Sequence, residues 1–282
     1  MSRGGRRKRE IERRLRELDR LDAKYGLGAP VPQQGAPRDW RRFGVPLATI
    51  ALTLSIVLAV PGIAPVSMRN AFGLGPHRLG RPPAVAASGA YEFIARQRGT
   101  GSRPVTWDPC RPIRYQVNID GGPPEAAALV ASAVSEVSKA TGLRFEYDGL
   151  TDARPQWKTG YLPFLASRRP VLVSWATEAE VSQLAGRVAG IGGSLPLPAR
   201  DGRLRFVTGG VTLDSDSFAA LDERRGGPAL ERAIVLHELG HLVGLAHVTD
   251  QSELMYADNV GLLDYGPGDR AGLARLGAGP CF

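Results

Sequence analysis

The sequence lacks several features that would assign it to a well-marked class of protein. It has no internal repeat, which argues against a solenoid or another repeat architecture. It has only two cysteines in 282 residues, so one intramolecular disulfide is the most that can form. Histidine is also rare, with four residues. The remaining composition, 43% hydrophobic and 23% charged, is that of one foldable domain with attached segments.

Positive charge is missing from the part of the chain that would have to bind a nucleic acid. The net charge is +8, but residues 1–42 contain 13 Lys or Arg against 6 Asp or Glu, a balance of +7. The other 240 residues contain 23 against 22, a balance of +1. A nucleic-acid-binding domain keeps its basic excess on its folded surface. We therefore expect no nucleic-acid partner.

Charged residues are also absent from residues 43–68. Within them, Val45–Val66 is long enough to cross a bilayer, since about 20 apolar residues in a helix suffice. A buried core helix is an alternative, although such a helix normally carries a polar stripe. A cleaved signal peptide is another, with a cleavage site in Ala84–Ala87, but 42 preceding residues are many for an n-region. We expect a transmembrane segment over residues 43–68 and the membrane as a partner.

Flanking charges set the expected orientation of this segment. The close flanks carry equal numbers of arginines and therefore do not set the orientation. The whole basic tail and Arg41 and Arg42, directly beside the segment, place the N-terminal side in the cytoplasm. This predicts a single-pass protein of the cell membrane, with its N-terminus cytoplasmic and its C-terminal bulk extracellular. An extracellular position also fits one disulfide between Cys110 and Cys281.

The basic tail, residues 1–42, includes a short charged helix predicted over residues 6–25. Its apolar residues on one side are Ile11, Leu15, Leu18 and Tyr25. Such a helix binds anionic lipid, forms a short dimerising coil, or is simply solvated, and these alternatives stay open. Residues 69–103 are rich in Gly, Pro and Ala, which predicts a linker.

The folded domain is expected over residues 104–282. Apolar patterns predict strands at 113–120, 143–147, 171–175 and 204–213, the last with a bulge at Gly209–Gly210. Prolines at helix starts and glycines at helix ends predict helices at 123–139 and 228–242, and a last short helix is expected at 269–276. Strands followed by helices in this order predict an α+β or α/β domain with a mixed sheet.

Three of the four histidines fall in the segment HELGHLVGLAH. Residues four apart share a helix face, so His237 and His241 can bind one metal ion, and Glu238 lies close enough to act on a water held there. Gly244 ends the helix, and the following turn returns His247 as a third ligand. Three neutral nitrogens and an open fourth position are typical of a catalytic site with one Zn²⁺. A chance HExxH on a surface helix is the alternative, and the added glycine and third histidine argue against it.

The pattern HExxHxxGxxH is the signature of the metzincin zinc endopeptidases, and the chain most resembles the matrixin-like, bacterial membrane-anchored or secreted members. Residues Glu253–Tyr256, which include Met255, resemble the methionine turn beneath the metal. The similarity extends loosely over Trp107–Phe282. It implies an α+β, metzincin-like catalytic domain with a mixed twisted sheet, an active-site helix and a small C-terminal subdomain. It also implies that an extended substrate lies along an edge strand within Val188–Leu195.

The resemblance implies a membrane-anchored zinc endopeptidase that hydrolyses peptide bonds of extended protein or peptide substrates. In this implied enzyme, His237, His241 and His247 hold the metal and Glu238 is the catalytic base. One alternative is a binding protein on an inactive scaffold of this type, against which the intact Glu238 argues. Another is a sensor whose functional end is the basic helix.

Some features of matrixins have weak counterparts here. A second, structural zinc needs further histidines, and only His77 remains, in the predicted linker. A Ca²⁺ site is represented at most by Asp214 and Asp216 in a polar turn, so bound Ca²⁺ is not favoured. The segment WDPCRPI around Cys110 does not match the family's cysteine switch, and a disulfide with Cys281 is the preferred interpretation.

Overall fold

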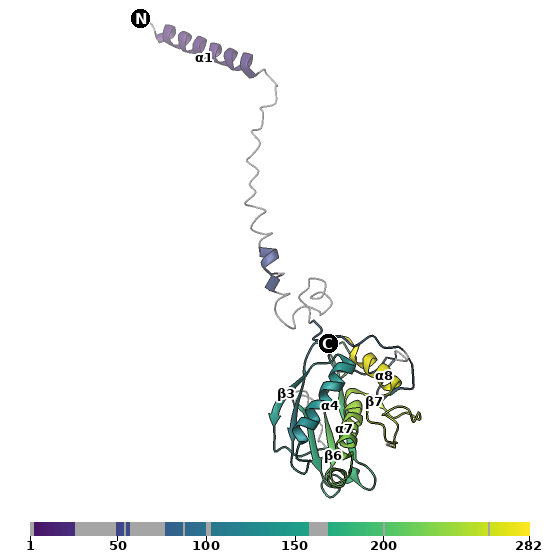
Figure 1. The fold of residues 1–282 in the computed structure, drawn as a ribbon. Coiled ribbons are helices and arrows are strands. Elements are labelled where there is room, and N and C mark those ends of the chain that lie inside the picture. The colour runs from purple at the N-terminus through teal and green to yellow at the C-terminus, as the bar shows by residue number, and fades with distance from the viewer. Residues whose placement is uncertain are drawn as a thin grey trace. The chain divides into compact units, whose positions relative to one another are not determined.

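The computed structural model describes residues 3–25, 49–53, 55–56, 77–86, 88–99, 103–157, 169–199, 201–258 and 260–282. The chain divides into two compact units, Met1–Pro65 and Val66–Phe282 (Figure 1). The first unit contains helix α1, Arg3–Tyr25, over the stretch where the charge pattern predicts one. The second unit contains a sheet, its covering helices and the histidine motif.

No helix in the described part of the chain is long and apolar enough to cross a membrane. Of the predicted span 43–68, only residues 49–53 and 55–56 are described, all of them helical, and the others lie outside the described residues. Crossing a bilayer takes about 20 consecutive apolar residues in one helix, and no described helix meets this requirement. The predicted transmembrane segment is therefore wrong. The predicted membrane partner, the cytoplasmic N-terminus and the extracellular catalytic domain, which rested on it, are withdrawn.

A five-stranded mixed sheet organises the second unit, in the order β3-β2-β4-β6-β5. Its strands are β2 (Ile113–Asn118), β3 (Phe145–Leu150), β4 (Val171–Ala176), β5 (Gly190–Pro198) and β6 (Leu204–Asp214). The pairs β2–β3, β2–β4 and β4–β6 are parallel, whereas β5 runs antiparallel to β6 at the edge. The mixed sheet and its helices agree with the α+β prediction.

Helices α4 (Ala126–Thr141) and α7 (Gly227–Val243) lie side by side, and α8 (Pro267–Gly277) contacts both (Figure 1). The shorter α6 (Ser215–Asp222) follows β6, and a 3-10 turn, η1, covers Ser182–Leu184. Local sequence sets the ends of the long helices: α4 stops at Gly142 with φ +69°, a conformation that glycine adopts without strain. One large apolar core joins buried residues of the strands and these helices, including Val130, Val173 and Leu236.

Strand β5 approaches α7 closely because it is rich in glycine. Successive residues of a strand face opposite sides of the sheet. A Cβ on Gly192 would overlap the backbone carbonyl oxygen of Glu238 in α7, and one on Gly190 would lie 2.8 Å from Glu238 Cγ. On the other face, a Cβ on Gly193 would lie 3.7 Å from the ring of Trp157, an ordinary contact. The glycines on one side of β5 therefore let the strand and α7 meet backbone to backbone.

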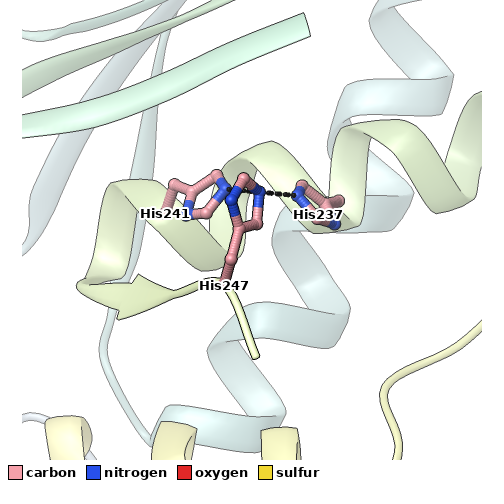
Figure 2. A group of neighbouring side chains, drawn as sticks. All are labelled: His237, His241 and His247. Carbon is pink, nitrogen blue, oxygen red and sulfur yellow. Dashed lines mark hydrogen bonds between the residues drawn. The ribbon is translucent and has the colours of Figure 1, made fainter. Parts of the chain in front are cut away.

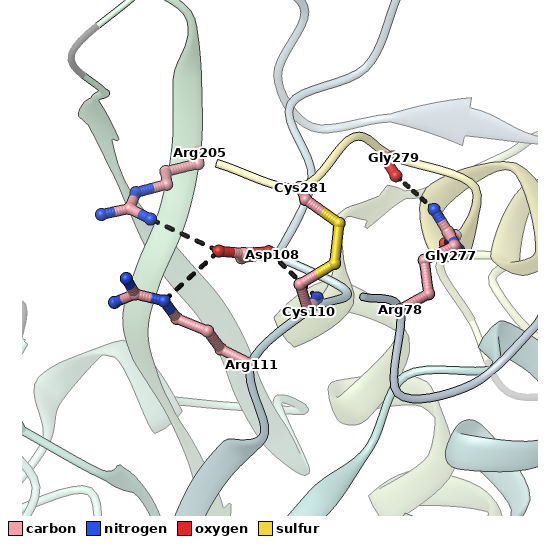
Figure 3. Close-up of a disulfide and its surroundings, with 8 residues drawn as sticks. All are labelled: Arg78, Asp108, Cys110, Arg111, Arg205, Gly277, Gly279 and Cys281. Carbon is pink, nitrogen blue, oxygen red and sulfur yellow. Dashed lines mark hydrogen bonds and ion pairs between the residues drawn. A yellow bond between two sulfur atoms is a disulfide. The ribbon is translucent and has the colours of Figure 1, made fainter. Parts of the chain in front are cut away.

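Residues before the predicted domain boundary at 104 take part in the fold. Strand β1 (Glu92–Phe93) pairs with β7 (Leu245–Ala246), and Phe93 is buried in the main core. The Arg78 guanidinium donates to the backbone carbonyls of Gly277 and Gly279, the latter at 2.6 Å (Figure 3). Part of the segment predicted as a linker thus lies against the C-terminal end of the domain.

A disulfide joins Cys110 to Cys281, as predicted, with the two Cα atoms 5.4 Å apart (Figure 3). Next to it, Asp108 accepts a hydrogen bond from the Cys110 N–H at 3.0 Å and pairs with Arg111 and Arg205, each at 3.6 Å. Because the two sulfurs are bonded to each other, neither cysteine has a free thiol that could bind a metal ion. The disulfide connects the loop before β2 to the segment after α8.

Candidate metal centre

The three histidines of the motif converge on one point (Figure 2). His237 and His241 lie one turn apart on α7, which ends at Gly244, where φ is +121° and the N–H bonds back to the carbonyls of Gly240 and His241. The chain then passes through β7 and presents His247. Its Nε2 lies 3.1 Å from His237 Nε2 and 3.1 Å from His241 Nε2.

Backbone carbonyls fix which nitrogens of two of these rings carry the proton. His237 Nδ1 lies 2.8 Å from the Leu254 carbonyl oxygen, and His241 Nδ1 lies 2.8 Å from that of Leu245. A carbonyl oxygen can only accept, so each Nδ1 must donate. In the neutral ring, the opposite Nε2 then carries a lone pair and no proton. Two lone pairs therefore point at His247 Nε2, an arrangement that a cation between the three nitrogens would stabilise.

The spacing of these nitrogens fits zinc. Zinc–nitrogen bonds of about 2.05 Å at tetrahedral angles put two ligand nitrogens about 3.3 Å apart. The observed 3.1 Å separations are close to this value. Three histidines also leave the fourth tetrahedral position open, as a catalytic ion requires.

Electrostatics favours the neutral imidazoles that metal binding needs. Burial lowers the pKa of His237 to about 4 and that of His241 to about 3. Burial also lowers the pKa of His247, the more exposed ring. Ligand histidines must be unprotonated, so these shifts keep the site ready for a metal at neutral pH.

Glu238 is almost completely buried beside the first histidine, with 6% of its surface exposed. Its Oε2 has no hydrogen-bond partner among the described residues, which is a costly arrangement for a buried carboxyl group. Burial raises its pKa to about 8. A nearby divalent cation would favour the carboxylate and offset this desolvation. The orphaned oxygen thus fits a site that is completed by a metal and its water.

Met255 lies on the side of α7 that carries Gly240. It is buried, and a Cβ on Gly240 would come within 2.6 Å of its sulfur. The Met255 carbonyl accepts from the Val248 N–H at 3.0 Å, which ties the turn to the residue after His247. Met255 therefore packs against the motif helix and supports the segment that presents the third histidine.

Two buried carboxylates that sequence reasoning missed hold the same turn. Asp269 accepts from the N–H of Leu254 at 2.6 Å, and Leu254 is the residue whose carbonyl orients His237. In return, Glu253 accepts from the N–H groups of Gly268 at 2.8 Å and Asp269 at 2.9 Å. Asp269 sits in the first turn of α8, after a proline, which is a signal for a helix-capping acid.

The last turn of α7 is held from two sides. The Leu242 carbonyl has no partner within the helix, and it accepts from Trp107 Nε1 at 2.9 Å and from Ser194 Oγ at 2.5 Å. Trp107 belongs to the loop that carries the disulfide, and Ser194 belongs to β5. The loop and the edge strand thereby fix the helix end next to His241.

The residues that were considered and not favoured for a Ca²⁺ site or a second zinc site lie apart from this centre. Asp214 caps α6, accepting from the Ser217 N–H at 2.9 Å, and Asp216 is exposed on the first turn of that helix. Among the described residues, neither aspartate belongs to a group of three or more candidate ligands, and His77 does not join the histidine cluster. The pairing of Cys110 with Cys281 likewise removes the cysteine-switch alternative.

Comparisons with known proteins leave the family open. No protein-family model matches the sequence, and no curated protein matches it. Among solved structures, the GM1-bound ECX AB5 holotoxin aligns with a TM-score of 0.27 and 16% identity, over 50% of this chain and 55% of that one. The chain thus spans little more than half of the holotoxin chain. Archaemetzincin from Methanopyrus kandleri aligns with a TM-score of 0.33 and 18% identity, over 56% of this chain and 84% of that one.

Proposed function

We propose that this chain is a zinc-dependent endopeptidase of the metzincin type, with His237, His241 and His247 as the metal ligands and Glu238 as the catalytic base. The observation that carries the proposal is the pair of carbonyl–Nδ1 contacts, which turn two Nε2 lone pairs toward the third histidine. The sequence HELGHLVGLAH supports it independently, because it matches the metzincin signature at every defined position.

The residues of the site have separable roles in such a reaction. His237, His241 and His247 would hold the zinc ion, which would supply a Lewis acid able to acidify water and polarise a peptide carbonyl. Glu238 accepts the proton of the attacking water on a carboxylate oxygen and passes it to the leaving amine. The Leu254 and Leu245 carbonyls keep the two helix histidines in the ligating tautomer.

Strand β5 supports an extended peptide as the substrate. It forms the edge of the sheet, so one side of its backbone has no neighbouring strand among the described residues. It also lies against Glu238 through Gly190. An extended peptide can pair with such an edge by backbone hydrogen bonds, with its side chains free for selection. The segment expected to bind substrate, Val188–Leu195, overlaps this strand, and we assign it that role.

A single variant separates an enzyme from a binding protein on the same scaffold. In the full chain loaded with zinc, Glu238→Gln should retain the metal while peptide cleavage falls by roughly 10²–10⁴-fold, the usual contribution of a general base. Cleavage is measured on a diverse peptide mixture, and bound zinc by elemental mass spectrometry. His241→Ala should lose the metal itself.

The matched control is Glu146→Gln, which makes the same change on the exposed edge strand β3 and should leave cleavage unchanged. A Glu238→Gln protein as active as the parent would disprove the assigned base. A zinc-loaded parent that cleaves no peptide would favour the binding protein instead.

A further inference from the structure

Helix α1 carries an apolar stripe that nothing in the first unit covers among the described residues. Four aliphatic side chains on α1 are half or more exposed: Ile11 52%, Leu15 53%, Leu18 61% and Leu21 50%. The rest of the helix is dominated by charged residues. Most of the stability of a helix in a protein comes from packing of its apolar face, so such a stripe normally lies against a partner.

The spacing of the stripe is that of a coiled-coil seam. Ile11, Leu15 and Leu18 are separated by four and then three residues, and Tyr25 follows seven residues after Leu18. In a heptad written abcdefg, this places Leu15 at a and the other three at d. The repeat averages 3.5 residues, which keeps the seam on one side when two helices supercoil.

Charges beside the seam select both the partner and its direction. The charged g positions hold Arg7 and Arg14, and the charged e positions hold Glu12 and Asp19, whereas Leu21 of the stripe occupies the last g position beside the seam. In a parallel, in-register pair of identical helices, each g residue meets the e residue five positions later in the other copy. Arg7 then faces Glu12 and Arg14 faces Asp19, once on each side of the pair. An antiparallel pair would instead place arginine against arginine and acid against acid.

We propose that α1 forms a parallel, in-register, two-stranded coiled coil with α1 of a second copy of this chain. Lys8 and Asp22 occupy the remaining a positions, and polar residues there fix the register and lower stability. The dimer is therefore reversible and concentration-dependent. Within one helix Arg14 also lies 3.6 Å from Glu10, but this exposed pair contributes little and leaves Arg14 able to reach the partner.

Light scattering on the full chain over a concentration series measures the dimer directly. The mass should rise from the 30.1 kDa of one chain toward twice that value. Leu15→Glu should remain monomeric at every concentration. A parent that stays monomeric throughout, or a dimer that survives Leu15→Glu, would overturn the proposal.

Charge reversal tests the pairing itself. Arg14→Glu or Asp19→Arg alone should each weaken self-association about tenfold, because two attractive contacts become repulsive. A mixture of the two single variants should associate as tightly as the parent, since opposite charges then face each other in the mixed dimer. Arg20→Glu changes the charge equally at an outward f position and should have no such effect. Failure of the mixture to recover would refute the assigned contacts.

Cysteine crosslinking tests the direction. Lys8→Cys places a thiol at an a position near one end of the helix, where parallel copies bring the two sulfurs together and antiparallel copies keep them apart. Mild oxidation should therefore crosslink Lys8→Cys chains and spare Arg13→Cys, which points outward at f. The chain's own cysteines are already paired and do not interfere. Equal crosslinking of both variants, or none of Lys8→Cys, would contradict a parallel coil.

Discussion

Gly192 and Gly193 allow a test of the contact between β5 and the motif helix. Both are consecutive glycines of one strand, and neither has a positive φ. A methyl group on Gly193 meets the Trp157 ring at 3.7 Å, an ordinary contact, whereas one on Gly192 overlaps the Glu238 carbonyl oxygen. Alanine at either position restricts the unfolded chain equally. The difference between the two variants therefore reports only the folded state.

The magnitudes separate the two outcomes. Where the backbone accepts it, Gly→Ala stabilises a protein by about 0.4–1 kcal/mol, so Gly193→Ala should be neutral or slightly stabilising. Gly192→Ala must push α7 away from β5, and overpacking of this kind costs roughly 1–3 kcal/mol. The expected gap in unfolding free energy is about 3 kcal/mol. For a domain of this size that corresponds to roughly 6–12 °C in Tm.

Thermal unfolding followed by circular dichroism measures the gap, and a competition assay with a chelating dye measures the affinity for zinc. Movement of α7 displaces His237 and His241 relative to His247, so Gly192→Ala should also bind zinc more weakly than Gly193→Ala. Equal Tm and equal zinc affinity for the two variants would refute the close approach of strand and helix.

Three further outcomes are expected. Zinc at a free concentration 100-fold above its Kd contributes about 2.7 kcal/mol to the free energy of unfolding. Removing it with a chelator should therefore lower Tm by roughly 5–11 °C in differential scanning calorimetry. An unchanged Tm would argue against a bound ion. Cys110→Ser should lower the unfolding free energy by at most about 5 kcal/mol, the chain-entropy value for a sequence separation of 171 residues, and a change within measurement error in urea titrations would contradict this. Burial raises the pKa of Asp269 to about 6. Its contribution to the stability of the metal-free protein is therefore fully present below about pH 4 and is lost as pH rises through about 6, by roughly 3 kcal/mol. In urea titrations at pH 4 and 7, Asp269→Asn should lack this loss, and an identical pH dependence in the variant and the parent would contradict the assignment.

Much of the sheet and its main helices could be predicted from local pattern. The strands near 113, 171 and 204 begin where alternation and prolines indicate, and α7 ends at the glycine that its motif requires. The convergence of three histidines follows from helix periodicity and one turn, which are local properties. The Cys110–Cys281 pair followed from elimination, since no other cysteine exists.

Other features depend on contacts that no local pattern reports. Strand β5 is largely Gly and Pro, so its sequence carries no strand signal, and it forms because α7 and β6 accept a backbone without side chains. The predicted bulge at Gly209–Gly210 is absent from the β5–β6 register, which instead shifts at Leu195–Pro196. Phe93 lies in a stretch with linker composition, and its burial depends on pairing with residues about 150 positions later. Hydropathy alone also gave the wrong transmembrane segment, since no helix of the described residues is long and apolar enough to cross a membrane.

The disulfide has a consequence for any test of the proposed peptidase activity. Any single backbone cut between Cys110 and Cys281, including one made by another copy of the same protein, leaves two fragments that remain covalently joined. Such a nicked molecule would keep its full mass on a non-reducing gel and separate into two bands only after reduction. Autolysis between the two cysteines would thus go unseen unless the samples were reduced.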